Sequence, residues 1–388
     1  MNKVLVYIKE GDLAPKGGAL GYNYHLHQQL VAMGATNISY LPGSSSLKAR
    51  ANGLIQGIKN KKIKYVLTVV KSILNKTKQL YGNKRACVDL SQYDVVHFHR
   101  PFDMFMCRDS LKTYTGKVVL TSHAPTLSSL QIIDMLTDWE KKYMMWLYKK
   151  FLTTDEYAFM RADYIFFPCP EAEEPYYNNW DKYSDIKNAK ADCYRYILTG
   201  TEKRRATISR EEVCKIYGIP QNAFIVCYAG RHNEIKGYDA LKRFGEQILA
   251  KYSNVYFLVA GKEEPLTGLD HDRWIEVGWT NDPHSLIKAS DLFMLPNKET
   301  YFDLILLEVL SLGKVVLASH TGGNRYFENN PGVLTYKSDL EALSIFEKIY
   351  KMSSEEKKTL EFDNEKLFDA TFSLPVFAKN YLDLIDSL

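Results

Sequence analysis

The sequence has no long apolar run and no paired cysteine motif. Nowhere in its 388 residues do ~18 or more apolar residues follow one another, as a membrane-spanning helix requires. The opening MNKVLVYIKEGD reaches charged residues too early for a signal peptide. The six cysteines include no CxxC pair, which favours reduced thiols over disulfides or zinc ligands. These absences predict a cytoplasmic protein without a membrane span.

Acidic residues are also missing from one long stretch. From Leu13 to Val88 there is none in 76 positions, where the chain average would place about nine. The same stretch carries twelve Lys or Arg, although the net charge of the whole chain is only +4. We therefore expect a polyanionic partner opposite this part of the chain.

Short apolar runs are abundant and alternate with amphipathic stretches of helix length. Continuous Val, Ile, Leu and Phe runs are typical of strands covered on both faces, so the alternation predicts parallel α/β layers. With 46% hydrophobic residues, the chain is long enough for two domains of about 180 residues each. The runs are 3–8, 94–99, 117–123, 162–169, 223–230, 255–261, 274–279, 291–296, 314–319 and 332–336.

A polar segment, residues 196–213, separates the two groups of runs. Its Ser209 is followed three residues later by Glu212, which is the capping-box signature of a helix start. We therefore predict two Rossmann-like domains, residues 1–198 and 199–370, with residues following each strand as the first candidates for a binding site.

After the first strand, Gly17 and Gly18 open a helix whose free amides could hold a phosphate. A Gly-Gly pair also suits an ordinary strand-to-helix turn. The pattern is not the GxGxxG of dinucleotide-binding domains, and no acidic residue follows about 20 residues later. A nicotinamide-dependent enzyme is therefore disfavoured.

The first strand of the second domain is followed by GRHNEIKG, in which Arg231 and Lys236 flank a turn. A guanidinium and an ammonium on one strand-end loop can clamp two adjacent phosphates. The alternative is a solvated surface turn.

A third candidate lies in NKETYFDLILLEVLSLGK, residues 297–314, where Glu308 is the only charge in a nearly unbroken apolar helix. An ionised carboxylate in such surroundings is costly without a partner. Glu308 is therefore expected either to form an internal ion pair or to accept hydrogen bonds from a pair of ligand hydroxyls.

Together the Gly-Gly pair, GRHNEIKG and LLEVLSLGKVVLAS resemble the GT-B-fold nucleotide-sugar glycosyltransferases, most closely glycosyltransferase family 4, of the group 1 type. The resemblance extends over nearly the whole chain, including YILTGT at the interdomain crossing. It implies an α/β GT-B fold, with two Rossmann-like domains facing each other across a cleft. Residues 1–198 would bind the acceptor and residues 199–370 the donor, and a helix in 371–388 would cross back to the N-terminal domain.

The resemblance also implies roles for the candidate residues of the donor site. Arg231 and Lys236 would bind the donor diphosphate and offset the charge of the leaving group. Glu308 would hold the ribose hydroxyls, and the amides of Gly17 and Gly18 would close on the diphosphate from the other domain.

Three residues at strand ends of the first domain complete the implied site. His123, in LTSHAP, would face the donor sugar, although a lone histidine at such a position is structural nearly as often. His99 and Arg100, in HFHRPFD, are candidates for the acceptor side.

The sequence departs from the family where relatives carry a first glutamate, eight positions before Glu308. That position is Thr300, and Glu299 lies one place early. Either the chain bulges so that Glu299 reaches the sugar, or Thr300 takes the position while Asp303, at the helix start, binds the sugar hydroxyls. We favour the second, because it keeps Phe302 at the aromatic position of the family without a shift, with Leu304 directly after Asp303.

Family members transfer sugars with retention of configuration and usually without a metal, and this sequence has no DxD motif at a strand end. With Arg and Lys serving the diphosphate, a metal ion becomes dispensable and no cofactor is implied. In the front-face mechanism the leaving phosphate itself accepts the proton of the acceptor, so no general base is assigned.

Residues 51–80, within the acid-free stretch, place apolar residues at helical spacing with lysines largely between them. Such a helix suits an anionic membrane surface, at roughly 1 kcal/mol per well-placed Lys or Arg, although it could instead pack on its own domain. No aromatic single-strand platform or recognition motif accompanies it, so nucleic acid is not expected.

The sequence therefore predicts a retaining, metal-independent glycosyltransferase, peripheral on the inner face of the cell membrane. Its donor would be a nucleoside-diphosphate sugar, with UDP as the expected nucleotide, and its acceptor a lipid-linked glycan or surface polysaccharide precursor. The alternative is a catalytically silent GT-B subunit that supports an active transferase. A nucleotide-sugar epimerase of the same fold is less favoured, because it would not need the basic helix.

Overall fold

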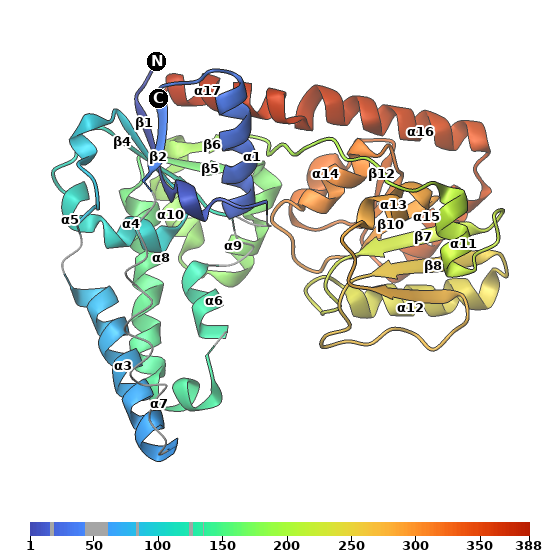
Figure 1. The fold of residues 1–388 in the computed structure, drawn as a ribbon, viewed down its shortest axis with the longest axis horizontal. Coiled ribbons are helices and arrows are strands. Elements are labelled where there is room, and N and C mark those ends of the chain that lie inside the picture. Colours follow the sequence, from blue (N-terminus) through green and yellow to red (C-terminus); the bar gives the residue numbers. More distant parts are fainter. Residues whose placement is uncertain (16–18, 43–60, 83–84, 124–126, 135) are drawn as a thin grey trace. The chain divides into compact units, whose positions relative to one another are not determined.

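The computed structural model describes residues 1–15, 19–42, 61–82, 85–123, 127–134 and 136–388 (Figure 1). The chain divides into two compact units. The first unit comprises Met1–Phe167, Asn179–Arg195 and Leu382–Leu388, and the second comprises Pro168–Asn178 and Tyr196–Tyr381. The sequence-based boundary between residues 198 and 199 lies just after Tyr196, where the main part of the second unit begins.

The first unit is built on a six-stranded sheet in the order β2-β1-β3-β4-β5-β6. The pairs β1–β2, β1–β3, β3–β4 and β4–β5 are all parallel. The strands are β1 (Val4–Lys9), β2 (Ile38–Leu41), β3 (Val95–Phe98), β4 (Lys117–Thr121), β5 (Tyr164–Phe167) and β6 (Tyr194–Tyr196).

Helices connect these strands, as crossovers between parallel strands require. They are α1 (Ala19–Ala32), α3 (Lys61–Tyr81), α4 (Pro101–Met106), α5 (Arg108–Leu111), α6 (Ser128–Asp134), α7 (Asp138–Tyr148), α8 (Leu152–Arg161) and α10 (Tyr183–Ala189).

The second unit contains another six-stranded sheet, in the order β12-β11-β10-β7-β8-β9, and all five of its strand pairs are parallel. Its core lies where α12 and α15 cover these strands. The strands are β7 (Phe224–Ala229), β8 (Val255–Ala260), β9 (Trp274–Gly278), β10 (Leu292–Leu295), β11 (Val316–Ser319) and β12 (Val333–Tyr336).

One helix start of the second unit was predicted from its capping signal. Ser209 and Glu212 form the predicted capping box at the start of α11, which confirms that helix start. The helices are α9 (Glu174–Asn179), α11 (Arg210–Tyr217), α12 (Tyr238–Lys251), α13 (Pro283–Ala289), α14 (Leu304–Ser311), α15 (Asp339–Lys351), α16 (Ser354–Leu367) and α17 (Leu374–Asp386), the last of which ends among residues of the first unit.

Each of the ten predicted apolar runs coincides with a strand, although β1 extends one residue beyond its run, and the parallel α/β prediction is confirmed. Two strands, β2 and β6, were missed. Both are short, both lie at an edge of the first sheet, and each buries only one residue, Leu41 and Tyr194 respectively. A strand so little buried lacks the apolar run on which the prediction depended.

Each sheet has a point where the chain changes direction across it. In the first sheet this point lies between β1 and β3, and in the second it lies between β10 and β7. Open α/β sheets bind ligands beyond the carboxyl ends of the strands at such a point. The residues that follow β3, β7 and β10 are therefore the candidates for a binding site.

Candidate functional site

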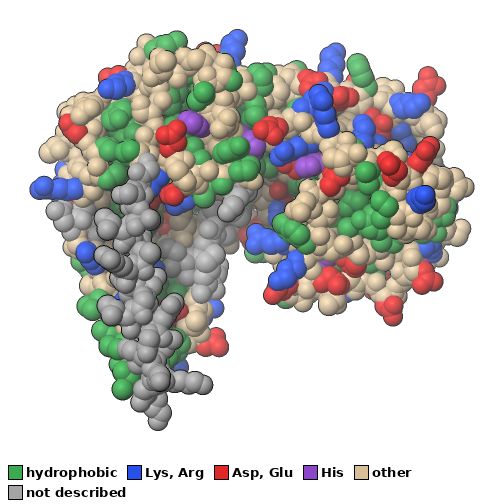
Figure 2. Space-filling view, viewed as in Figure 1, with side chains coloured by type: hydrophobic (Ala, Val, Ile, Leu, Met, Phe, Trp, Pro, Cys, Tyr) green, Lys and Arg blue, Asp and Glu red, His purple; other side chains and the backbone are tan. Residues whose placement is uncertain are grey.

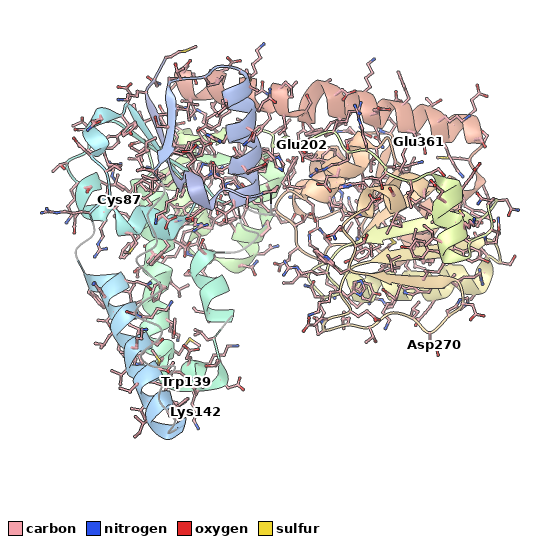
Figure 3. The ribbon with its side chains drawn as sticks, viewed as in Figure 1. Cys87, Trp139, Lys142, Glu202, Asp270 and Glu361 are labelled. Atoms are coloured by element: carbon pink, nitrogen blue, oxygen red, sulfur yellow. The ribbon has the colours of Figure 1, made fainter. Side chains whose placement is uncertain are left out.

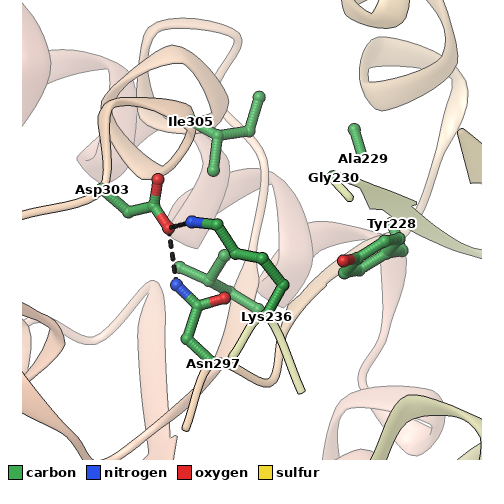
Figure 4. A pocket seen from close by; sticks show the side chains of 8 residues that line it. Tyr228, Ala229, Gly230, Lys236, Asn297, Asp303 and Ile305 are labelled. Atoms are coloured by element: carbon green, nitrogen blue, oxygen red, sulfur yellow. Dashed lines mark hydrogen bonds and ion pairs between the residues drawn. The ribbon is translucent and has the colours of Figure 1, made fainter. Parts of the chain in front are cut away.

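A cavity of about 200 Å³ lies at the switch point of the second sheet (Figure 4). Its wall combines the end of β7, the end of β10 and the start of α14, as the topology requires. A tyrosine, small residues and aliphatic side chains form most of the lining, together with one lysine, one aspartate and one asparagine. The lining residues are Tyr228, Ala229, Gly230, Lys236, Leu295, Asn297, Asp303 and Ile305.

Lys236 and Asp303 form an ion pair in this cavity, with 2.5 Å between Nζ and Oδ2. The Asn297 side-chain amide donates a second hydrogen bond to the same Oδ2. Figure 4 shows both side chains converging on the carboxylate. Asp303 is the N-cap residue of α14, as predicted, but its side chain makes no capping hydrogen bond because it is directed to Lys236 and Asn297.

The turn that carries Lys236 is tightly packed. The Lys236 amide donates to Asn233 Oδ1 at 2.9 Å, and Gly237 then starts α12 with φ +65°. A Cβ at Gly237 would come within 1.7 Å of the Pro296 carbonyl oxygen. A glycine is required here because only its bare Cα lets this turn approach the loop after β10 so closely.

Arg231 lies at the other end of the same turn and is exposed. Its carbonyl oxygen accepts a hydrogen bond of 2.9 Å from the Tyr228 hydroxyl, which fixes the backbone of the loop. Within the described residues its guanidinium forms no hydrogen bond or ion pair. Arg231 is therefore a solvated cation, whereas Lys236, five residues later, is paired with Asp303.

Glu308 lies one turn beyond Ile305 on α14 and forms the internal ion pair that the sequence left as one of two alternatives. Its Oε1 accepts from Arg204 at 2.8 Å and 3.2 Å, and its Oε2 accepts from His284 Nε2 at 3.1 Å. Burial alone would raise the pKa of Glu308, but the hydrogen bonds from His284 and Arg204 outweigh it and the pKa is lowered. The carboxylate is thus ionised and positioned.

The remaining residues of the 299–304 segment differ in their surroundings. Thr300 is buried, and its carbonyl oxygen lies so close to Gly322 that an added Cβ there would come within 1.9 Å. Phe302 is 7% exposed and contacts the rings of Tyr326, Phe327 and Phe372.

Glu299 is half-buried, and its carboxylate forms no hydrogen bond or ion pair within the described residues. It is not among the residues that line the cavity, whereas Asp303 is. Leu304 is the first residue of α14 and is half-buried.

In the first unit, a group of histidines gathers where β3 and β4 end. His99 Nδ1 and His123 Nε2 are 2.8 Å apart, and His97 Nε2 lies 2.7 Å from Thr121 Oγ1. The His97 and His99 ring centroids are 4.1 Å apart, and Tyr22 on α1 meets His123 edge-on at 4.6 Å. The sequence assigned His123 to the donor side and His99 to the acceptor side, yet the structure joins them by a hydrogen bond.

All three imidazoles are held neutral. Burial, followed by the neighbouring His123, lowers the pKa of His97 to about 3, and burial together with the charge of Arg100 lowers the pKa of His123 to about 3. Burial, followed by the neighbouring His97, His123 and Arg100, places the pKa of His99 well below its ordinary value. Arg100 itself is exposed, at the N-cap of α4. Gly17 and Gly18 lie outside the described residues.

Several residues of these sites were not predicted from the sequence. Asn297 had no signal beyond its place after β10, which applies equally to its neighbours. Arg204 and His284 lie in polar segments far from Glu308 in sequence, so only the fold could pair them with it. His97 could have been recognised, because a histidine inside the apolar run 94–99 needs a hydrogen-bond partner.

Residues 223–352 match the family described as glycosyl transferases group 1. The matched segment contains the Arg231–Lys236 turn, the cavity and Glu308. The resemblance to group 1 glycosyltransferases is confirmed. A relative from Escherichia coli, UDP-Gal:alpha-D-GlcNAc-diphosphoundecaprenol alpha-1,3-galactosyltransferase, is 29% identical over 143 residues, which cover 33% of this chain and only 36% of that protein.

Solved structures confirm the GT-B fold over the whole chain. Sucrose-phosphate synthase from Thermosynechococcus elongatus has a TM-score of 0.64 at 16% identity, covering 99% of this chain and 98% of that one. Anabaena Alr3699/HepE, solved in complex with UDP and glucose, has a TM-score of 0.60 at 12% identity and full coverage of both chains. The group 1 segment, residues 223–352, thus forms most of the second GT-B unit.

Proposed function

We propose that this protein is a glycosyltransferase that moves a sugar from a nucleoside-diphosphate sugar to a lipid-linked glycan or surface polysaccharide precursor. The observation that carries the proposal is the cavity at the β7–β10 switch point, which holds Lys236 and Asp303 inside the segment matched by the group 1 family. A cation for phosphate and a carboxylate for hydroxyls are the two groups that a sugar diphosphate needs.

In this proposal Arg231 and Lys236 bind the diphosphate. Arg231 is solvated and available, whereas Lys236 is neutralised by Asp303 and exchanges that partner for a phosphate oxygen when the donor enters. The exchange leaves the Asp303 carboxylate free to accept hydrogen bonds from hydroxyls of the sugar. As the bond to the sugar breaks, charge grows on the leaving phosphate and both cations stabilise it.

Glu308 is the proposed partner of the ribose hydroxyls. Its carboxylate is ionised and already accepts from Arg204 and His284, so its position is fixed before the nucleotide binds. A carboxylate has about four lone-pair sites, and three are used by these donors. One site remains for a ribose hydroxyl.

UDP is the proposed nucleotide. The Anabaena structure of the same fold contains UDP, and the relative from E. coli is named for a UDP-sugar donor and a diphosphoundecaprenol acceptor. A lipid diphosphate acceptor also agrees with the acid-free stretch from Leu13 to Val88, because both the acceptor and an anionic membrane carry negative charge.

Retention of configuration without a metal is part of the proposal. The cations that would offset the leaving charge are side chains, Arg231 and Lys236, so no metal ion is required for that step. The leaving phosphate oxygen would accept the proton of the acceptor hydroxyl on the face where the sugar departs. His123 would face the donor sugar, and the exposed Arg100 is the candidate for the acceptor side, whereas His99 is buried against His123.

The membrane contact is proposed for α3 together with α7. Residues 61–81 are helical, as predicted, while residues 51–60 lie outside the described part. Ile63, Val66, Val70 and Leu74 of α3 are exposed, and the ring centroids of Tyr65 and Trp139 are 5.7 Å apart. Trp139 lies at the start of α7, where Figure 3 labels it.

Helix α7 adds aromatic side chains to this surface. Tyr143 is 64% exposed and Trp146 is 63% exposed, with the exposed Lys142 beside them. Figure 2 shows hydrophobic side chains on the surface in this part of the first unit. Aromatic residues and lysines together are typical of contact with lipid headgroups. Among the described residues no helix is both long and apolar enough to cross a membrane.

Slow hydrolysis of the donor tests the proposed activity without knowledge of the acceptor. The full chain is incubated with a panel of UDP-sugars and free UDP is measured, with Lys236→Ala as the control. We expect one donor to be hydrolysed by the wild type alone. The rival function, a silent subunit of another transferase, is favoured by Thr300 at the position where relatives carry a glutamate, and it predicts no hydrolysis with any donor.

A further inference from the structure

The histidine group at the ends of β3 and β4 has an asymmetry that bears on its protons. His99 is 2% exposed, and its Nδ1 is hydrogen bonded to His123 Nε2 at 2.8 Å. Its other ring nitrogen, Nε2, is buried and has no hydrogen-bond partner among the described residues. One nitrogen of His99 is thus satisfied by His123, and the other is buried.

A hydrogen bond between two neutral imidazoles needs a proton on one nitrogen only. If the proton lies on His99 Nδ1, then His99 donates, His123 Nε2 accepts, and His123 must carry its own proton on Nδ1. If the proton lies on His123 Nε2, then His99 accepts through Nδ1 and must carry its own proton on the buried Nε2. The two arrangements differ in which atom of His99 is left unpaired.

The unpaired atom of His99 decides between the two arrangements. In the first, the unpaired atom of His99 is a bare lone pair, and in the second it is a buried N–H. Orphaned buried N–H groups are rarer in proteins than under-satisfied acceptors. The first arrangement is therefore the more stable.

We propose that His99 is a positioning residue that holds His123 as the neutral tautomer with its proton on Nδ1. Burial and the charge of Arg100 also oppose an imidazolium at either position, as the lowered pKa values of both residues indicate. Ring packing supports this geometry. The His99 and His123 rings are stacked with 5.1 Å between their centroids, the His97 ring packs tilted against His99 at 4.1 Å, and Tyr22 lies edge-on to His123 at 4.6 Å.

The consequence for chemistry rests on the proposed function. His123 would meet the sugar as a hydrogen-bond donor through Nδ1, because Nε2 is occupied by His99. His123 could not accept a proton at Nδ1, which already carries one. It could not accept one at Nε2 either, because that nitrogen accepts the hydrogen bond from His99. His123 therefore orients a sugar hydroxyl oxygen or the departing oxygen, and the proton of the acceptor must go elsewhere.

Nitrogen-15 NMR of the full chain, labelled on histidine, tests the tautomer directly. Protonated and bare imidazole nitrogens differ widely in chemical shift, and the His97→Gln, His99→Asn and His123→Gln variants assign the signals. We expect His99 and His123 both to be neutral and protonated at Nδ1 at pH 7. A proton on Nε2 of either residue, or on both nitrogens of His123, would overturn the proposal. This measurement needs no activity, so it stands even if no donor is found.

Kinetics supply a second test that separates positioning from packing. His99→Phe keeps a ring in the stack but removes the donor, whereas His99→Asn places an amide N–H near the former Nδ1. We expect kcat to fall about tenfold in His99→Phe, with the donor KM little changed, and to recover in His99→Asn.

Thr121→Val is the matched control, because it removes the hydrogen bond of His97 in the same stack without touching His123. Its kcat should stay within a factor of about two of the wild type. Equal losses in all three variants, at unchanged melting temperature, would show that the stack acts by packing and would contradict the positioning role.

Discussion

Lys236 and Asp303 are joined by an ion pair of 2.5 Å between Nζ and Oδ2, at the point where β7 and β10 end side by side. The two residues are 67 positions apart in the sequence, and each was expected to bind a different part of the donor. Their pairing means that donor binding replaces an existing interaction. Part of the binding free energy of the diphosphate is therefore spent on separating Lys236 from Asp303.

Replacing Lys236 by Ala should lower turnover about 10²-fold or more, because it removes a cation that stabilises the leaving phosphate. The side chain is half-buried and forms no part of the core of the second unit, so the fold should persist. Steady-state kinetics with the hydrolysed donor measure the effect, and Lys215→Ala, at an exposed position on α11, is the matched control. Unchanged activity in Lys236→Ala would remove the residue from the diphosphate site.

The second prediction concerns which carboxylate binds the sugar. Asp303 lines the cavity and Glu299 does not, so Asp303→Asn should impair donor use more than Glu299→Gln. Thr300→Val should also impair donor use more than Glu299→Gln does. Comparison of kcat/KM for the three variants decides the question. If Glu299→Gln abolished transfer while Asp303→Asn were nearly silent, the bulged arrangement would be correct.

Glu308→Gln should weaken nucleotide binding whatever the sugar, because the ribose contact is common to all donors. Titration calorimetry with UDP and with two UDP-sugars measures this. Equal affinities in the wild type and the variant would leave Glu308 with a purely structural role, through Arg204 and His284.

The same variant has a predicted pH dependence of stability. The pKa of Glu308 is lowered on folding, so its ion pairs stabilise the folded state fully above the ordinary glutamate pKa of about 4.5 and lose that effect as the pH falls through the folded-state value. Melting temperatures of the wild type and Glu308→Gln should therefore differ at pH 7 and converge as the pH falls below about 4.5. A constant difference down to the lowest pH would contradict this.

Membrane binding should depend on charge as well as on apolar contact. Replacing Lys61, Lys62 and Lys64 by Glu should abolish co-sedimentation with phosphatidylglycerol-rich liposomes, and high salt should weaken the binding of the wild type. Tyr143→Ser together with Trp146→Ser should weaken it without changing the salt dependence. If the charge-reversal variant still bound, the membrane contact would lie elsewhere.

The strands could be predicted because buried parallel strands leave a local trace. The runs 223–230 and 255–261 are apolar throughout, because both faces of β7 and β8 are covered. Such a run is visible in consecutive residues of the sequence. The edge strand β2 has no such trace, because a strand paired on one side and half exposed does not need an apolar sequence.

The sequence by itself determined the fold class, the family resemblance and the short set of residues that follow the strands. Those features depend on local periodicity and on motifs such as GRHNEIKG, which are written in consecutive positions. The partners of these residues were decided only by the tertiary structure. Lys236 meets Asp303, and His99 meets His123, because parallel strands far apart in sequence bring their ends to one edge of a sheet. Glu308 meets His284 because α14 packs against α13, and it meets Arg204 from the segment before α11. Hydrogen bonds and ion pairs form between groups a few ångströms apart in space. The separation of two residues along the chain does not tell whether they come that close.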